Sequence, residues 1–81
     1  MAKRRELVDI ADGLRTNEGF EENIRNIENI KSYAQYGMGV EISDDEAKNI
    51  QQCLQNLELE NNKNGNWSDN WYKYVVYKLD S

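Results

Sequence analysis

With 81 residues and a net charge of −5, the chain can form one small domain, and a domain of this size has a thin core. It has no histidine and a single cysteine, Cys53. These counts exclude an intrachain disulfide, a histidine-containing metal site and a Ser-His-Asp mechanism. We therefore expect one domain over residues 1–81 that depends on good helix packing or on self-association for its stability.

The composition also limits the location of the protein. No run of about 18 apolar residues is present, so we expect no transmembrane helix. The amino-terminal segment has basic residues but lacks the apolar centre of a secretory signal. Together with a single reduced cysteine, this pattern indicates a cytoplasmic protein. The asparagine-rich composition is compatible with a small bacterial or phage-like source.

The first predicted element is a helix over residues 3–14. Its apolar positions follow the spacing i, i+3, i+4 and i+7, which places them on one face of a helix: Leu7, Ile10, Ala11 and Leu14. We expect this face to be buried.

The second predicted element is a long helix over residues 17–36. Ile24, Ile27 and Ile30 recur at every third position, and on a helix they sweep about 120°, which is an acceptable buried stripe. The asparagines between them are poor helix formers, so this helix must lean on tertiary packing. Gly37 is placed where a glycine C-cap would end it.

The third predicted helix covers residues 44–59 and has the clearest start signal. Ser43 is followed three residues later by Glu46, which is the pattern of a capping box. A buried stripe at helical spacing then follows, made by Ala47, Ile50, Leu54 and Leu57. Cys53 lies at the edge of this stripe, which indicates a structural thiol. The segment after residue 59 is predicted to be a polar loop with a turn at Asn64-Gly65.

The carboxyl-terminal segment, residues 69–79, is rich in aromatic and β-branched side chains. That composition is typical of a strand, but its alternation is poor and a lone strand lacks a neighbour. As a helix it would begin at Ser68 as N-cap. We favour the helix and leave the strand open. In both cases Trp67 and Trp71 are expected to be buried, and the side near Tyr72 and Tyr77 is expected to face outward.

The fold class is thus mainly α, a bundle of three helices completed by an aromatic segment. No residue pattern supports catalysis, so we predict no enzyme activity, no cofactor, no metal and no small-molecule substrate. The combination of aromatic excess and an acidic segment at 41–60 predicts a protein-interaction module, such as an adaptor, an inhibitor or an immunity-type factor. Its partner would be another protein, with a basic surface.

The candidate partner-binding residues form two groups. The aromatic group consists of Trp71, Tyr72, Tyr74 and Tyr77, and the acidic group consists of Asp44 and Asp45. The two aspartates also suit the first turn of a helix, where the helix dipole favours negative charge, so a purely structural role stays open.

Two other interpretations are kept. In one, the aromatic segment closes the interface of a homodimer. In the other, Lys3-Arg4-Arg5 binds nucleic acid together with aromatic stacking, although the net acidity and the acidic residues that follow this triplet argue against it.

Overall fold

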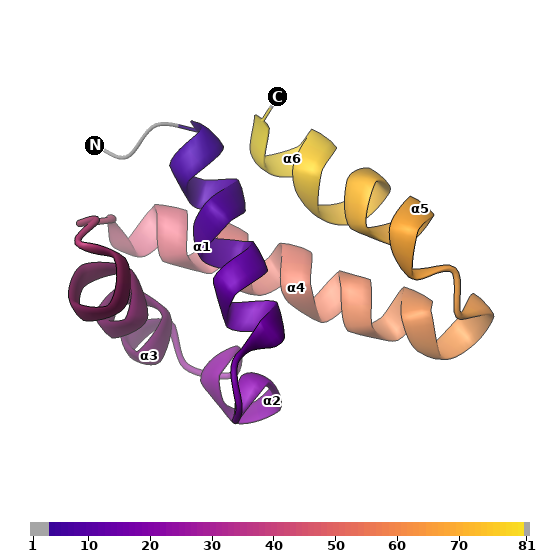
Figure 1. Ribbon diagram of the computed structural model, residues 1–81, viewed down its shortest axis with the longest axis horizontal. Helices are drawn as coiled ribbons and strands as arrows, with labels where there is room; N and C mark the ends of the chain where they lie inside the picture. The colour runs from indigo at the N-terminus through magenta and orange to yellow at the C-terminus, as the bar shows by residue number, and fades with distance from the viewer. Residues whose placement is uncertain (1–3, 81) are drawn as a thin grey trace.

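Helices form the whole framework of the protein (Figure 1). The computed structural model describes residues 4–80, and within this range there is no strand, so the mainly α prediction is confirmed. The elements in chain order are α1 (Arg4–Thr16), α2 (Phe20–Asn23), α3 (Ile27–Ser32), the π-helical turn η1 (Tyr33–Gly37), α4 (Asp44–Asn64), α5 (Trp67–Trp71), the π-helical turn η2 (Tyr72–Val76) and α6 (Tyr77–Asp80). Lys3, which the first predicted helix included, lies outside the described residues.

The long helix α4 is the centre of the packing. Elements α5, η2 and α6 follow one another without a break, and we call them together the C-terminal helix. It reverses direction after α4 and returns along it, while α1 crosses α4 and packs against α6 (Figure 1). Helix α3 packs against α4, and η1 contacts α1. The shortest extent of the molecule is 18 Å, about two helix diameters, so the helices form two layers.

The core lies where these helices meet and contains the apolar stripes predicted for the first and third helices. Its buried apolar side chains are Leu7, Ile10, Ala11, Leu14, Ile24, Ile30, Ala34, Ile42, Ala47, Ile50, Cys53, Leu54, Leu57, Val75 and Leu79. Phe20, Tyr33 and Trp71 are partly buried against it. Helices α1, α3, α4 and α6 and both π-helical turns contribute buried residues to this single cluster, and the short α2 and α5 contact it through Phe20 and Trp71. Tertiary packing of this kind holds several short helices in place in a chain of this size.

The start of α4 matches the prediction. The Ser43 hydroxyl accepts a hydrogen bond from the Glu46 backbone N–H at 3.2 Å, and the Glu46 carboxylate accepts one from the Ser43 N–H at 2.9 Å. The end of α4 does not match, because the helix runs to Asn64 instead of residue 59. It ends at Gly65, whose left-handed φ of 68° suits glycine. The last turns continue because they pack against the C-terminal helix.

The single helix predicted over residues 17–36 is wrong. Gly19 has a left-handed φ of 82° and precedes the one-turn α2, and the chain is extended at Asn26. The Asn26 side chain accepts a hydrogen bond from the Glu28 backbone N–H at 2.9 Å and so begins a new helix, α3. Asparagine competes with the helix in this way because its short side chain can bond to nearby backbone groups. The break turns both Ile24 and Ile30 into the core.

The predicted C-cap at Gly37 is also wrong. Gly37 is part of the π-helical turn η1, and the residue with left-handed φ is Gly39, at 71°. The Val40 N–H donates to the Ala34 carbonyl oxygen at 2.9 Å, which closes this end of the segment. Gly37 serves another purpose: a Cβ atom there would stand 3.3 Å from the ring of Tyr33, so its small size lets the ring lie against the backbone.

Gly13 makes a second close contact with Tyr33, from α1. A Cβ atom at this position would overlap the Tyr33 hydroxyl. In an open helix, Gly→Ala stabilises by about 1 kcal/mol. Here we expect Gly13→Ala to destabilise by about 1–3 kcal/mol, because overpacking forces Tyr33 to move. Urea unfolding followed by circular dichroism measures the difference. In the Tyr33→Phe background, which removes the overlapping atom, the cost of Gly13→Ala should fall. A gain in stability from Gly13→Ala alone would contradict the contact.

The C-terminal segment is helical from Trp67 to Asp80, so the strand alternative is wrong and the helix is confirmed with an earlier start. Its buried residues are Asn70, Val75 and Leu79, spaced by five and then four. Five residues turn about 500° on an α-helix, which would put Val75 well off the face of Asn70. The i→i+5 geometry of η2 absorbs the extra residue and keeps the three on one side. The N-cap position is Asn66, not Ser68.

Candidate functional site

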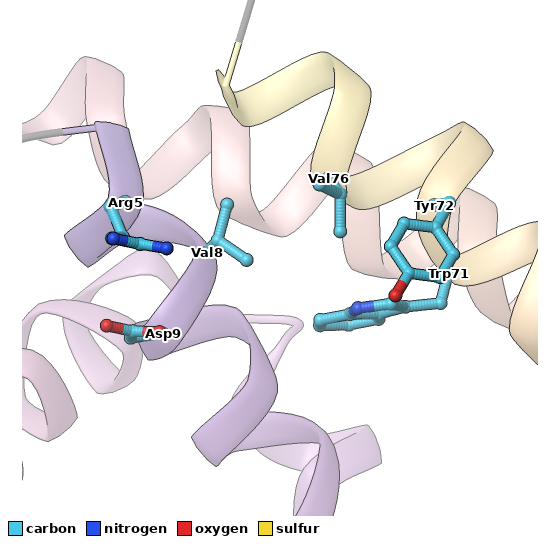
Figure 2. A pocket seen from close by; sticks show the side chains of 6 residues that line it. All are labelled: Arg5, Val8, Asp9, Trp71, Tyr72 and Val76. Carbon is cyan, nitrogen blue, oxygen red and sulfur yellow. The ribbon is translucent and has the colours of Figure 1, made fainter.

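A groove lies between α1 and the C-terminal helix. It has a volume of about 520 Å³. We call it the aromatic groove. One wall is formed by Arg5, Val8 and Asp9 of α1, and the other by Trp71, Tyr72 and Val76 of the C-terminal helix. Figure 2 shows the Trp71 indole extending from the C-terminal helix toward α1, with Val8 and Val76 above it. The groove therefore joins two ends of the sequence that only the fold brings together.

Trp71 is the side chain that connects the groove to the core. It is half-buried and packs against the core cluster. The guanidinium of Arg15 lies 5.0 Å from the centre of its ring, and that guanidinium also forms an ion pair with Asp12 at 3.0 Å. These contacts hold the indole in place, since a cation over an aromatic face is attracted by the ring. The expected burial of Trp71 is met only in part, because the indole also lines the groove.

Tyr72 and Tyr77 lie outward, as expected. Their exposed fractions are 54% and 66%, and their ring centres are 6.3 Å apart. Residues five apart do not meet on an α-helix, and the π-helical turn between them brings these two rings together. A π-helical insertion is often found at functional sites. The insertion thus makes an exposed aromatic pair that a regular helix would have separated.

The burial predicted for Trp67 is wrong. Its exposed fraction is 55%, because it begins the C-terminal helix beyond the end of α4, where little of the core remains to cover it. Trp67 instead lines a second hollow together with Arg15, Trp71 and Tyr72. This hollow shares two side chains with the aromatic groove, so the concave surface continues from the groove to Trp67 and Ser68.

Tyr74 is not part of this surface. It is half-buried and lines neither the aromatic groove nor the adjoining hollow, and the ammonium of Lys73 lies 5.6 Å from its ring centre. Of the four aromatic candidates, the structure therefore brings together Trp71, Tyr72 and Tyr77 and leaves Tyr74 apart.

The acidic candidates lie away from the aromatic groove, at the start of α4. Asp44 forms an ion pair with Lys31 of α3, with 2.7 Å between Nζ and the carboxylate oxygen. The hydrogen bond from Lys31 lowers the pKa of Asp44, and the same bond raises the pKa of Lys31. Asp45 is exposed in the first helical turn. Helix α4 has 21 residues and is about 30 Å long, so these carboxylates are far from Trp67 at its other end.

Cys53 is buried in the core, and this burial raises the pKa of its thiol. A buried thiol with a raised pKa is a poor nucleophile, so the prediction of a structural role agrees with its position. Among the described residues there is no cluster of three or more side chains that could hold a metal ion.

The sequence reasoning missed a set of three asparagines where α4 meets the C-terminal helix. Asn70 Nδ2 donates hydrogen bonds to Asn61 Oδ1 at 2.7 Å and to Asn64 Oδ1 at 2.9 Å. Asn61 and Asn70 are the buried polar residues of the described chain. The available signal was that Asn61 follows Leu54 and Leu57 at helical spacing. An asparagine at such a position is also typical of a polar loop, and only the packing of the C-terminal helix against it shows that it is buried.

The helices of residues 4–80 include none with the length and apolar character needed to cross a bilayer. Comparison of the whole chain with protein-family models, with curated proteins and with solved structures found no match.

Proposed function

We propose that this chain is a cytoplasmic protein-interaction module, of the adaptor, inhibitor or immunity type. The aromatic groove would receive an apolar segment of another protein. The observation that carries this proposal is the exposed pair of Tyr72 and Tyr77, of which Tyr72 lines, together with Trp71, a concavity large enough for several side chains. Tyrosine and tryptophan are the side chains that most often anchor protein interfaces, because each offers a large rigid surface with a polar end.

The charge of the chain supports a partner with a basic rim around that segment. The net charge is −5, and such a charge speeds the encounter with a positively charged surface. The groove itself carries one charge of each sign, Arg5 and Asp9, and neither forms an ion pair with another described residue. Both are free to pair with groups of the partner at the edge of the interface.

Capture of a partner from nuclease-treated extract of the source cells tests the proposal. We expect a specific protein bound by the native chain and lost with Tyr72→Ala. The matched control is Tyr36→Ala, which removes an exposed tyrosine of η1 that does not line the groove and should leave capture unchanged. Circular dichroism establishes that both variants are folded. Equal capture by both variants, or loss with both, would overturn the role of the aromatic groove.

Self-association through the same groove is the second candidate. Arg5 and Asp9 lie one helical turn apart on α1, and both line the groove. In a two-fold symmetric dimer every contact between the subunits occurs twice. If Arg5 of one subunit pairs with Asp9 of the other, the reverse pair therefore forms as well. Light scattering between about 1 and 100 μM decides this candidate. A dimer that Tyr72→Ala dissociates supports it, and a monomer over the whole range excludes it.

A further inference from the structure

The hydrogen bonds among the asparagines determine which way each amide points. Asn64 Oδ1 accepts the Asn66 backbone N–H at 2.8 Å, and only the oxygen of an amide can do so. Asn70 must then direct its Nδ2 at Asn64 Oδ1, and the same Nδ2 donates to Asn61 Oδ1. Asn61 therefore presents its oxygen to Asn70, and its Nδ2 is directed elsewhere.

That remaining nitrogen is an exception to a strong rule. Asn61 has an exposed fraction of only 8%, and its buried Nδ2 has no hydrogen-bond partner among the described residues. Buried donors are almost always paired, because leaving one unpaired costs about 1–3 kcal/mol. Such a donor is available to an acceptor from outside the chain, either a water molecule or a group of a binding partner.

Asn61 lines a separate pocket, whose size and lining suit a single amino-acid side chain of a binding partner. We call it the asparagine pocket; its volume is about 220 Å³ and its lining includes Phe20, Leu57, Trp67, Glu21 and Glu58 besides Asn61. Small-molecule sites usually exceed about 300 Å³, so this pocket suits one side chain of a larger partner. Trp67 also lines the hollow that adjoins the aromatic groove, so the pocket borders the proposed interface.

The chemistry of the pocket combines an apolar wall, negative charge and one donor. Phe20 and Trp67 offer aromatic faces, and the carboxylates of Glu21 and Glu58 form no ion pair with the described residues. A long apolar stem that ends in a cation matches the wall and the carboxylates. A carbonyl oxygen matches the donor of Asn61. An arginine residue in a peptide carries all three features.

We propose that the asparagine pocket binds an arginine of the partner protein. Its guanidinium pairs with Glu21 and Glu58, and its stem packs against Trp67. Its main-chain carbonyl accepts the hydrogen bond of Asn61 Nδ2. Arginine fits better than lysine, since its planar guanidinium can stack on an indole and contact two carboxylates at once. The chain already uses this contact in Arg15 on Trp71, at 5.0 Å.

The unliganded pocket must open slightly for the carbonyl to reach Nδ2, which is covered from solvent. Trp67 can move without disturbing the core, because more than half of its side chain is exposed. Binding is therefore expected to change the environments of Trp67 and Asn61 together. This site rests on the proposed function, because the arginine belongs to the partner protein.

Nuclear magnetic resonance with ¹⁵N-labelled protein tests the site without the partner. The probe is N-acetyl-arginine N-methylamide, for which we expect a dissociation constant on the order of 1 mM, as for other small fragments. The side-chain amide of Asn61 and the indole N–H of Trp67 should shift together and saturate. The citrulline analogue has the same shape without the charge, and it should bind at least about threefold more weakly.

Two variants of equal charge provide the control. Glu58→Gln removes a carboxylate of the pocket and should weaken binding about two- to fivefold. Glu60→Gln removes a carboxylate outside it, which pairs with Lys63 at 3.5 Å, and should leave binding unchanged. Equal binding of the arginine and citrulline probes, equal effects of the two variants, or shifts that never saturate would each overturn the arginine site.

The two proposals can fail separately. If Tyr72→Ala abolishes capture of a partner and Glu58→Gln has no effect on the probe, the protein interaction stands and the arginine site is wrong. If the probe binds as expected and no partner depends on Tyr72, the pocket stands and the aromatic groove is not the interface.

Discussion

Replacing Leu54 by alanine is expected to cost about 2–5 kcal/mol of the free energy of unfolding. Leu54 is fully buried on α4, where it faces the other helices of the core. The substitution removes its apolar contacts and leaves a cavity that the short surrounding helices cannot fill without moving. A domain of this size often has only about 3–5 kcal/mol in total. We therefore expect the variant to be largely unfolded at room temperature, as far-UV circular dichroism and a urea titration would show.

Leu59 supplies a matched control on the same helix. Its exposed fraction is 58%, although it is the same residue type with a similar helical preference. Leu59→Ala should change the free energy of unfolding by no more than about 0.5 kcal/mol, because it removes few buried contacts. Similar losses for the two variants would show that α4 presents a different face to the core.

Asn70→Ala is expected to destabilise the protein by about 1–3 kcal/mol. The substitution leaves Asn61 Oδ1 buried without its donor, and it removes two side-chain hydrogen bonds from the C-terminal helix to the end of α4. Hydrogen exchange should show the last turns of α4 and the start of the C-terminal helix opening more often than the rest, since local opening follows the loss of local contacts.

An apolar double variant separates the hydrogen bonds from simple packing. Asn61→Leu combined with Asn70→Leu removes both buried polar groups and keeps a similar volume. Such a pair is expected to be close to native stability, because no unpaired polar atom is left behind. Asn62→Ala, on the exposed face of the same turn, should have little effect. If Asn62→Ala costs as much as Asn70→Ala, the asparagine contacts do not carry the stability of this region.

Local chemistry in the sequence was sufficient for much of the framework. The capping box of Ser43 and Glu46 marks the start of α4 because it needs only residues within one helical turn. The stripes of α1 and α4 were predictable for a related reason, since helical periodicity alone assigns Leu7 or Leu54 to a buried face. The buried thiol of Cys53 follows from the same periodicity.

Predictions failed where the decisive contact comes from another part of the chain. The break at Asn26 and the π-helical turn at Tyr33–Gly37 position Ile24, Ile30 and the Tyr33 ring, which packs on Gly13 of α1. No local signal distinguishes that glycine from a weak helix residue.

The candidate site shows the same division. Composition alone marked the C-terminal segment as the place with excess aromatic surface. Which rings are exposed depends on the π-helical turn that pairs Tyr72 with Tyr77, and on α1, whose packing forms the groove with Trp71. The sequence by itself determined a small, acidic, helical domain with the buried stripes of α1 and α4, because these properties depend on residue type and local spacing. Only the tertiary structure decided the groove, the exposure of Trp67 and the unpaired amide of Asn61, because each depends on helices that are distant in the chain and adjacent in space.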